Sequence, residues 1–138
     1  MPRRLLYWTF TPLLVAWLLL GGTLDLMRAS AVVAILSTLH YPLYLSSILG
    51  IAKLLAVAAI LHPRTRLLRE WAYAGITFDA LGAVFSHLAV KDTVSAIIAP
   101  IIFLAFAVVS YLCRPTGYRI AKISELKEAA EQTPSLTA

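Results

Sequence analysis

Residues 70–90, EWAYAGITFDALGAVFSHLAV, are long enough to cross a bilayer as a helix, although Asp79 lies near their centre. About 20 apolar residues span the hydrocarbon core, and a carboxylate at that depth needs a partner. A helical projection gives a small, polar face and a large, apolar face. The small face holds Ala72, Gly75, Asp79, Gly82, Ala83 and Ser86, and the apolar face holds Tyr73, Leu81, Val84 and Leu88. Because small residues let helices approach closely, we expect the small face to meet the bundle interior and the apolar face to meet lipid.

The composition of the whole chain is typical of a membrane protein. Of 138 residues, 60% are hydrophobic and 14% are charged, and the mean hydropathy is +0.82. A soluble domain of this length could not bury four long apolar runs. The net charge of +5 arises from basic residues at the ends of those runs, which argues against a nucleic-acid partner and for a lipid bilayer.

The sequence predicts an all-α, integral membrane bundle of four transmembrane helices, over residues 5–24, 44–61, 70–90 and 93–113. The segment 25–41 is too short to span, and Pro42 ends it, so we expect an interfacial or re-entrant helix there. A fifth crossing would place Arg3 and Arg4 on the side of the membrane opposite the other basic clusters.

The basic residues also predict the orientation of the bundle. With four crossings, only Arg28 and Lys91 fall opposite the main basic clusters, so both termini are expected in the cytoplasm. The bundle is expected over residues 1–117. Residues 118–138 are expected to form a cytoplasmic amphipathic segment and a disordered tail.

Two charged residues are predicted to meet inside the membrane. Lys53 and Asp79 each lie thirteen residues from residue 66, in the turn between the second and third predicted helices. Equal separation from a hairpin turn gives equal depth, since both helices rise about 1.5 Å per residue. Each charge left alone at mid-membrane would cost roughly 2.5–3.5 kcal/mol, so we expect them to pair. The sequence leaves open whether the pair is ionic or shares a proton, and whether it is structural or functional.

The same arithmetic matches small residues across this hairpin. It places Gly50 opposite Gly82 and Ser46 opposite Ser86. Ser46, Ser86 and His87, with the charged pair, are the candidate lining of a polar pocket. The alternative for His87 is a simple cap at the end of its helix.

Other residues have structural explanations. Gly75 belongs to the small face, Glu70 suits the start of its helix and is expected to pair with Arg64, Arg66 or Arg69, and Trp71 fits an aromatic belt. The Gly21-Gly22 pair is interpreted as a helix end. The single cysteine, Cys113, excludes an intrachain disulfide, and no metal-type His/Cys cluster or catalytic set is recognisable, so a stand-alone enzyme is not predicted.

The middle of the chain resembles the DoxX-like membrane proteins. The residues that carry this resemblance are Tyr41-Pro42, Gly50, Lys53, Pro63-Arg64, EWAYAG at 70–75, Asp79, Gly82-Ala83 and Ser86-His87. The resemblance implies a four-helix bundle in the bacterial inner membrane. The family is named for a small subunit of a membrane thiosulfate:quinone oxidoreductase, but the resemblance does not carry thiosulfate oxidation to this chain.

Three functions stay open at this point. The resemblance favours an accessory membrane subunit that docks a redox enzyme and holds quinone or lipid between the second and third helices. The first alternative is a small-solute or proton-coupled permease that uses Lys53 and Asp79. The second is a structural or assembly factor without a ligand. Homo-oligomer formation also stays open.

Overall fold

The computed structural model describes residues 2–62 and 66–115, and these residues are helical with short connections. The helices are α1 (Pro2–Leu26), α2 (Ser30–Thr38), α3 (Tyr44–Leu61), α4 (Arg66–Ala89) and α5 (Val94–Cys113). No strand occurs in the described ranges, which confirms the all-α prediction. The predicted amphipathic segment over 118–138 lies outside the described residues.

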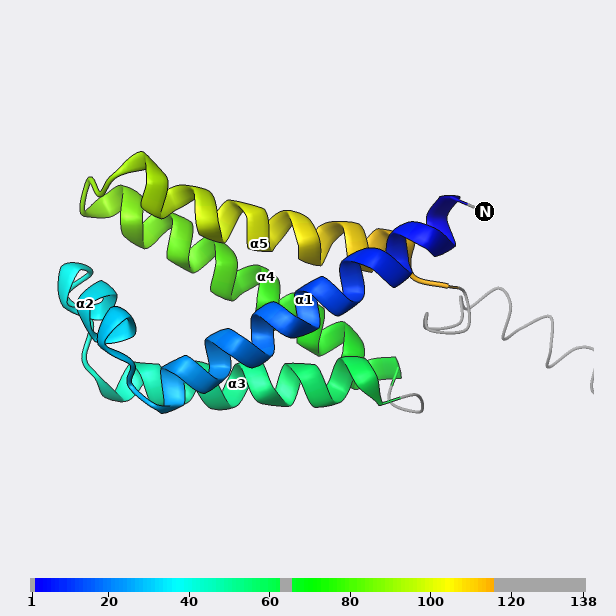
Figure 1. Cartoon of the computed structure of the whole chain (residues 1–138), viewed down its shortest axis with the longest axis horizontal. Helices are drawn as coiled ribbons and strands as arrows, with labels where there is room; N and C mark the ends of the chain where they lie inside the picture. Colours follow the sequence, from blue (N-terminus) through cyan, green and yellow to red (C-terminus); the bar gives the residue numbers. More distant parts are fainter. Residues whose placement is uncertain (1, 63–65, 116–138) are drawn as a thin grey trace, which may run out of the picture.

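The four long helices run between two ends of the molecule (Figure 1). The start of α1, the end of α3, the start of α4 and the end of α5 lie at one end, and α2 and the α4–α5 turn lie at the other. Helix α1 packs against both α3 and α5, while α4 packs more extensively on α5 than on α3. The arrangement therefore leaves α3 and α4 less tightly joined than the other neighbouring helices.

Among the described residues, three segments are long and apolar enough to cross a membrane, namely Arg3–Leu26, Tyr44–Leu61 and Val94–Cys113. They correspond to the first, second and fourth predicted spans. Helix α4 has the necessary length, with 24 residues, but it carries more charged and polar side chains than the other three.

Three helices end with a residue in the left-handed conformation. The residues are Arg28, His40 and Lys91, with φ of 49°, 58° and 55°. Each is followed by an amide that bonds a carbonyl five residues earlier, as between Tyr41 N and Leu36 O at 2.9 Å. This closure satisfies carbonyl groups that the helix leaves open. The closures at Arg28 and His40 end α1 and α2, so α2 is a separate short helix within the predicted segment 25–41.

Helices α1 and α3 approach each other closely at two glycines. A Cβ on Gly50 would lie 2.9 Å from the Gly22 carbonyl oxygen and 2.8 Å from Leu26 Cγ. The prediction that Gly50 faces Gly82 is therefore wrong, and nothing lies within 4 Å of a Cβ built on Gly82. The hairpin arithmetic considered only α3 and α4, whereas α1 takes the small face of α3.

The buried face of α4 also differs from the prediction. Tyr73, Ile76 and Ala80 are at most 4% exposed and belong to the hydrophobic core. Gly75 and Gly82, which were expected in the interior, are exposed. Because α4 packs more on α5 than on α3, Tyr73 lies against Tyr111 of α5, and Ala72, Gly75 and Asp79 are left on the side toward α3.

Replacing Gly50 with alanine should destabilise the protein by roughly 1–3 kcal/mol, because the new methyl group meets backbone atoms of α1. Gly82→Ala is the matched control and should be neutral or gain up to about 1 kcal/mol of helix propensity. Thermal unfolding of both variants in lipid nanodiscs, followed by circular dichroism, measures the difference. Equal melting temperatures would contradict the α1–α3 contact.

Candidate functional site

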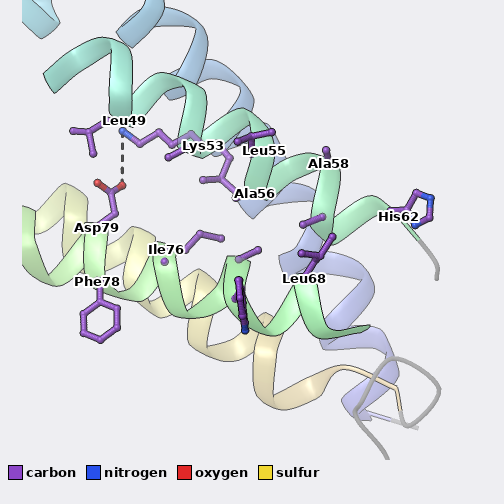
Figure 2. A pocket seen from close by; sticks show the side chains of 16 residues that line it. Leu49, Lys53, Leu55, Ala56, Ala58, His62, Leu68, Ile76, Phe78 and Asp79 are labelled. Atoms are coloured by element: carbon purple, nitrogen blue, oxygen red, sulfur yellow. Dashed lines mark ion pairs between the residues drawn. The ribbon is translucent and has the colours of Figure 1, made fainter. Parts of the chain in front are cut away.

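Lys53 lies between two carboxylates. Its Nζ is 2.7 Å from Asp25 Oδ2 and 3.8 Å from Asp79 Oδ2. The side chains of Asp25, Lys53 and Asp79 are 11%, 20% and 25% exposed. Figure 2 shows Lys53 and Asp79 directed at each other from α3 and α4. We call these three residues the Lys53 triad.

The triad joins three helices. Asp25 lies in the last turn of α1, Lys53 near the middle of α3, and Asp79 near the middle of α4. The predicted pairing of Lys53 with Asp79 is confirmed as a contact. Asp25 was missed, because the sequence analysis placed it outside the first helix, yet α1 continues to Leu26. The sequence signal that could have pointed to Asp25 is its position one helical turn after the Gly21-Gly22 pair.

The Gly21-Gly22 pair makes room for the lysine and is not a helix end. A Cβ on Gly22 would lie 3.1 Å from Lys53 Cβ, and one on Gly21 would lie 3.8 Å from Lys53 Cδ. Ser46 Oγ donates a hydrogen bond to the backbone carbonyl of Asp25. These contacts hold the end of α1 against α3 and place the Asp25 carboxylate beside the ammonium group.

An elongated groove opens between α3 and α4, with a volume of about 870 Å³. Lys53 and Asp79 form one end, and His62 lies toward the other end in Figure 2. Its walls are mainly apolar and include the small residues Ala52, Ala56, Ala58, Ala59, Ala72 and Gly75. Ala72, Gly75 and Asp79, which belong to the small face of α4, line this groove, whereas Gly82, Ala83 and Ser86 lie outside it. Lys53 and His62 are nine positions apart along α3 and its C-cap, which corresponds to about 14 Å.

A chain of buried hydroxyl groups joins α1, α4 and α5. Ser110 Oγ lies 2.7 Å from Thr11 Oγ1 and 2.7 Å from the Tyr73 hydroxyl. All three residues are less than 9% exposed. Each hydroxyl has a partner, so these polar groups can be buried without an unpaired hydrogen bond.

Charged side chains close the end of the bundle where α3 ends and α4 begins. Glu70 Oε1 is 2.7 Å from Arg114 Nη1, a partner that the sequence analysis did not consider. The Arg114 guanidinium lies 4.0 Å from the centre of the Tyr111 ring, in a cation–π contact. Buried Arg69 donates hydrogen bonds to the carbonyls of Ile60 and His62, at 3.2 and 2.7 Å, and so caps α3. Arg64 lies outside the described residues.

The other predicted pocket residues do not converge. Ser46 bonds Asp25, whereas the Ser86 hydroxyl lies 2.8 Å from the Tyr41 hydroxyl, so the predicted match of Ser46 with Ser86 is wrong. His87 Nδ1 is 2.8 Å from Asp92 Oδ2. The hydrogen bond from the Thr93 amide, together with the one from His87, lowers the pKa of Asp92 below its ordinary value.

Trp71 is 68% exposed and lines the groove. Within residues 2–62 and 66–115, no three His, Cys, Asp or Glu side chains are grouped to hold a metal ion. Cys113 is a free, partly buried thiol at the end of α5.

The sequence model of the DoxX-like family matches residues 9–110, which include α2, α3 and α4 and most of α1 and α5. The chain belongs to the DoxX-like family. No curated protein and no solved structure gave a significant match. Membership and the apolar helices together indicate a small transmembrane protein. The Lys53 triad lies within the matched DoxX-like region, whereas Arg114 lies just outside it.

Lys53→Met should be the most destabilising change in the triad, by about 3 kcal/mol, because it leaves the Asp25 carboxylate without its counter-ion and removes the contact with Asp79. Asp79→Asn should cost much less, since Lys53 keeps its shorter contact with Asp25. Lys91→Met, at an exposed turn, is the matched control for loss of a lysine. Melting temperatures of the three variants in nanodiscs give the order of destabilisation. A larger loss in Asp79→Asn than in Lys53→Met would contradict the geometry.

Proposed function

We propose that this DoxX-like protein is an accessory membrane subunit of a quinone-linked redox system and binds a neutral ligand of the quinone class between α3 and α4. The observation that carries the proposal is the long apolar groove with Lys53 and Asp79 at one end. A partner enzyme would supply the electrons. The candidate site comprises the Lys53 triad and the groove residues near it, with Ser46 as a supporting residue.

The placement in the membrane is part of this proposal. We infer four crossings of the bacterial inner membrane by the bundle of residues 1–117, with both termini in the cytoplasm. Helix α4 would be about 36 Å long, enough to span. Its lower hydropathy reflects side chains with internal partners, such as Asp79 with Lys53 and Glu70 with Arg114.

The charges at the two ends of the bundle support this orientation. Among the described residues, the end with the start of α1 and the start of α4 carries arginines of α1, α4 and the segment after α5 (Figure 1). These arginines are Arg3, Arg4, Arg66, Arg69 and Arg114. The other end carries Arg28 and Lys91. Basic residues in short loops favour the cytoplasmic side.

The groove suits a molecule with one polar end and a long apolar body. Its volume of about 870 Å³ falls in the usual range of ligand pockets, which are mostly apolar with few polar groups. The Lys53 ammonium can donate a hydrogen bond to a ring carbonyl oxygen of a quinone. The alanines of α3 and the small face of α4 then leave space for an isoprenoid tail.

Cysteine labelling tests the four crossings. In a Cys113→Ser background, a membrane-impermeant maleimide should label Lys91→Cys in intact spheroplasts and should label His62→Cys only after the membrane is opened. These positions flank α4, so opposite accessibility means that α4 crosses. Labelling of both positions from the same side would contradict the proposed topology.

Ligand analysis tests the groove. The protein is isolated in native lipid without detergent exchange, and its bound small molecules are identified by mass spectrometry. We expect quinone with the wild type and at least a tenfold loss in Gly75→Leu, whose new side chain fills the groove. Gly82→Leu is the matched control, because its Cβ also meets open space but lies outside the groove, and it should retain quinone.

Two outcomes would overturn the ligand proposal. If the wild type carries only bulk phospholipid, the groove holds no specific quinone. If Gly75→Leu and Gly82→Leu retain quinone equally, the ligand is bound elsewhere. Either result would favour a structural role for the Lys53 triad over a binding role.

A further inference from the structure

The Lys53 triad contains two acidic groups and one basic group. Asp79 of α4 faces Lys53 of α3 and lies near Asp25 of α1. The Lys53–Asp25 and Lys53–Asp79 ion pairs share the same Nζ atom. Helices α2 and α5 contain no Asp, Glu, Lys or Arg. On α4 itself, the nearest acidic, basic or histidine residues, Glu70 and His87, are more than two helical turns away and bond Arg114 and Asp92, and the Tyr73 hydroxyl bonds Ser110. Within the described residues, Lys53 is therefore the basic partner of both carboxyl groups.

A net charge in this position is unfavourable. With both carboxylates and the lysine ionised, the triad carries one uncompensated negative charge on side chains that are at most 25% exposed. Removal of water disfavours such a charge strongly, and a group in this setting neutralises in preference to remaining ionised. One bound proton gives a neutral triad that keeps one ion pair.

The two distances indicate which carboxyl group holds this proton. Asp25 Oδ2 is 2.7 Å from Lys53 Nζ, which is the length of a charge-assisted hydrogen bond between ionised groups. Asp79 Oδ2 is 3.8 Å away, too far for a hydrogen bond, and Asp79 lines the groove. We propose that the triad is a one-proton binding site, in which Asp79 carries an exchangeable proton while Lys53 and Asp25 remain an ion pair.

The proton changes what the groove can bind. A neutral Asp79 carboxyl group is a hydrogen-bond donor, so both polar side chains at that end of the groove donate. The ligand class that matches is neutral and presents an acceptor oxygen, such as a carbonyl. The inference rests on the membrane placement in the proposed function, but it does not depend on the presence of a ligand.

Infrared spectroscopy of the full-length protein in lipid nanodiscs counts protonated carboxyl groups at neutral pH. Their C=O stretching band shifts when water is replaced by heavy water, which separates it from ester bands. The number expected is the number of triad carboxyl groups minus the number of ammonium groups. We therefore expect one group in the wild type, none in Asp79→Asn, and two in Lys53→Met.

The Asp25→Asn variant is the most discriminating one in this infrared experiment. It leaves Asp79 as the only counter-ion of Lys53, so Asp79 should become ionised and the band should vanish although Asp79 is still present. Asp92→Asn is the matched control and should retain the band, because Asp92 belongs to the α4–α5 turn. If Lys53→Met does not fold, as judged by circular dichroism, the two Asn variants still decide the count.

A wild-type spectrum without a protonated carboxyl band would overturn the proton site, as would a band that persists in Asp79→Asn or in Asp25→Asn. The measurement needs no bound quinone and can be repeated after lipid extraction. A titrating band in protein without quinone would leave the proton site standing while the ligand proposal fails. Bound quinone without a protonated carboxyl band would leave the ligand proposal standing while the proton site fails.

Discussion

The structure depends on neutralising one ammonium group at the centre of a membrane helix. Lys53 lies near the middle of α3, and a lysine at that depth is unfavourable unless opposite charge surrounds it. Asp25 and Asp79 come from helices on two sides, so both contacts of Lys53 form only when α1, α3 and α4 assemble with the correct register. A buried ion pair adds little net stability compared with apolar packing, but a broken pair is strongly unfavourable. The triad therefore selects one arrangement of the three helices.

This constraint explains the close contact between α1 and α3, beside which the groove opens. For the Asp25 carboxylate to reach Lys53, α1 must lie directly against α3, which requires glycine at positions 22 and 50. On the other side of α3, Lys53 reaches Asp79 of α4, and small residues of both helices line the groove beside this contact. Tyr73 of α4 packs on Tyr111 of α5. Lys53 thus belongs both to the polar cluster and to the lining of the groove.

Part of this arrangement can be predicted from sequence and part cannot. Helix positions follow from apolar runs, prolines and length, and the contact of Lys53 with Asp79 follows from the rise per residue in a hairpin. Both predictions use neighbours along the chain. The partners of Gly50 and the role of Asp25 depend on α1, which is distant in sequence, and periodicity does not say which helices pack together. The buried face of α4 was mispredicted for the same reason, since Tyr73 on that face contacts Ser110 and Tyr111 of α5.

The most direct test of the shared counter-ion is a distance measurement in lipid bilayers. Solid-state nuclear magnetic resonance can detect dipolar coupling between the Nζ of labelled lysine and the carboxyl carbon of labelled aspartate. The triad predicts that Lys53 Nζ couples to two aspartate carboxyl carbons, with the stronger coupling lost in Asp25→Asn and the weaker one lost in Asp79→Asn. Coupling of Lys53 to a single carboxyl carbon, or to none, would contradict the arrangement on which the fold and the site depend.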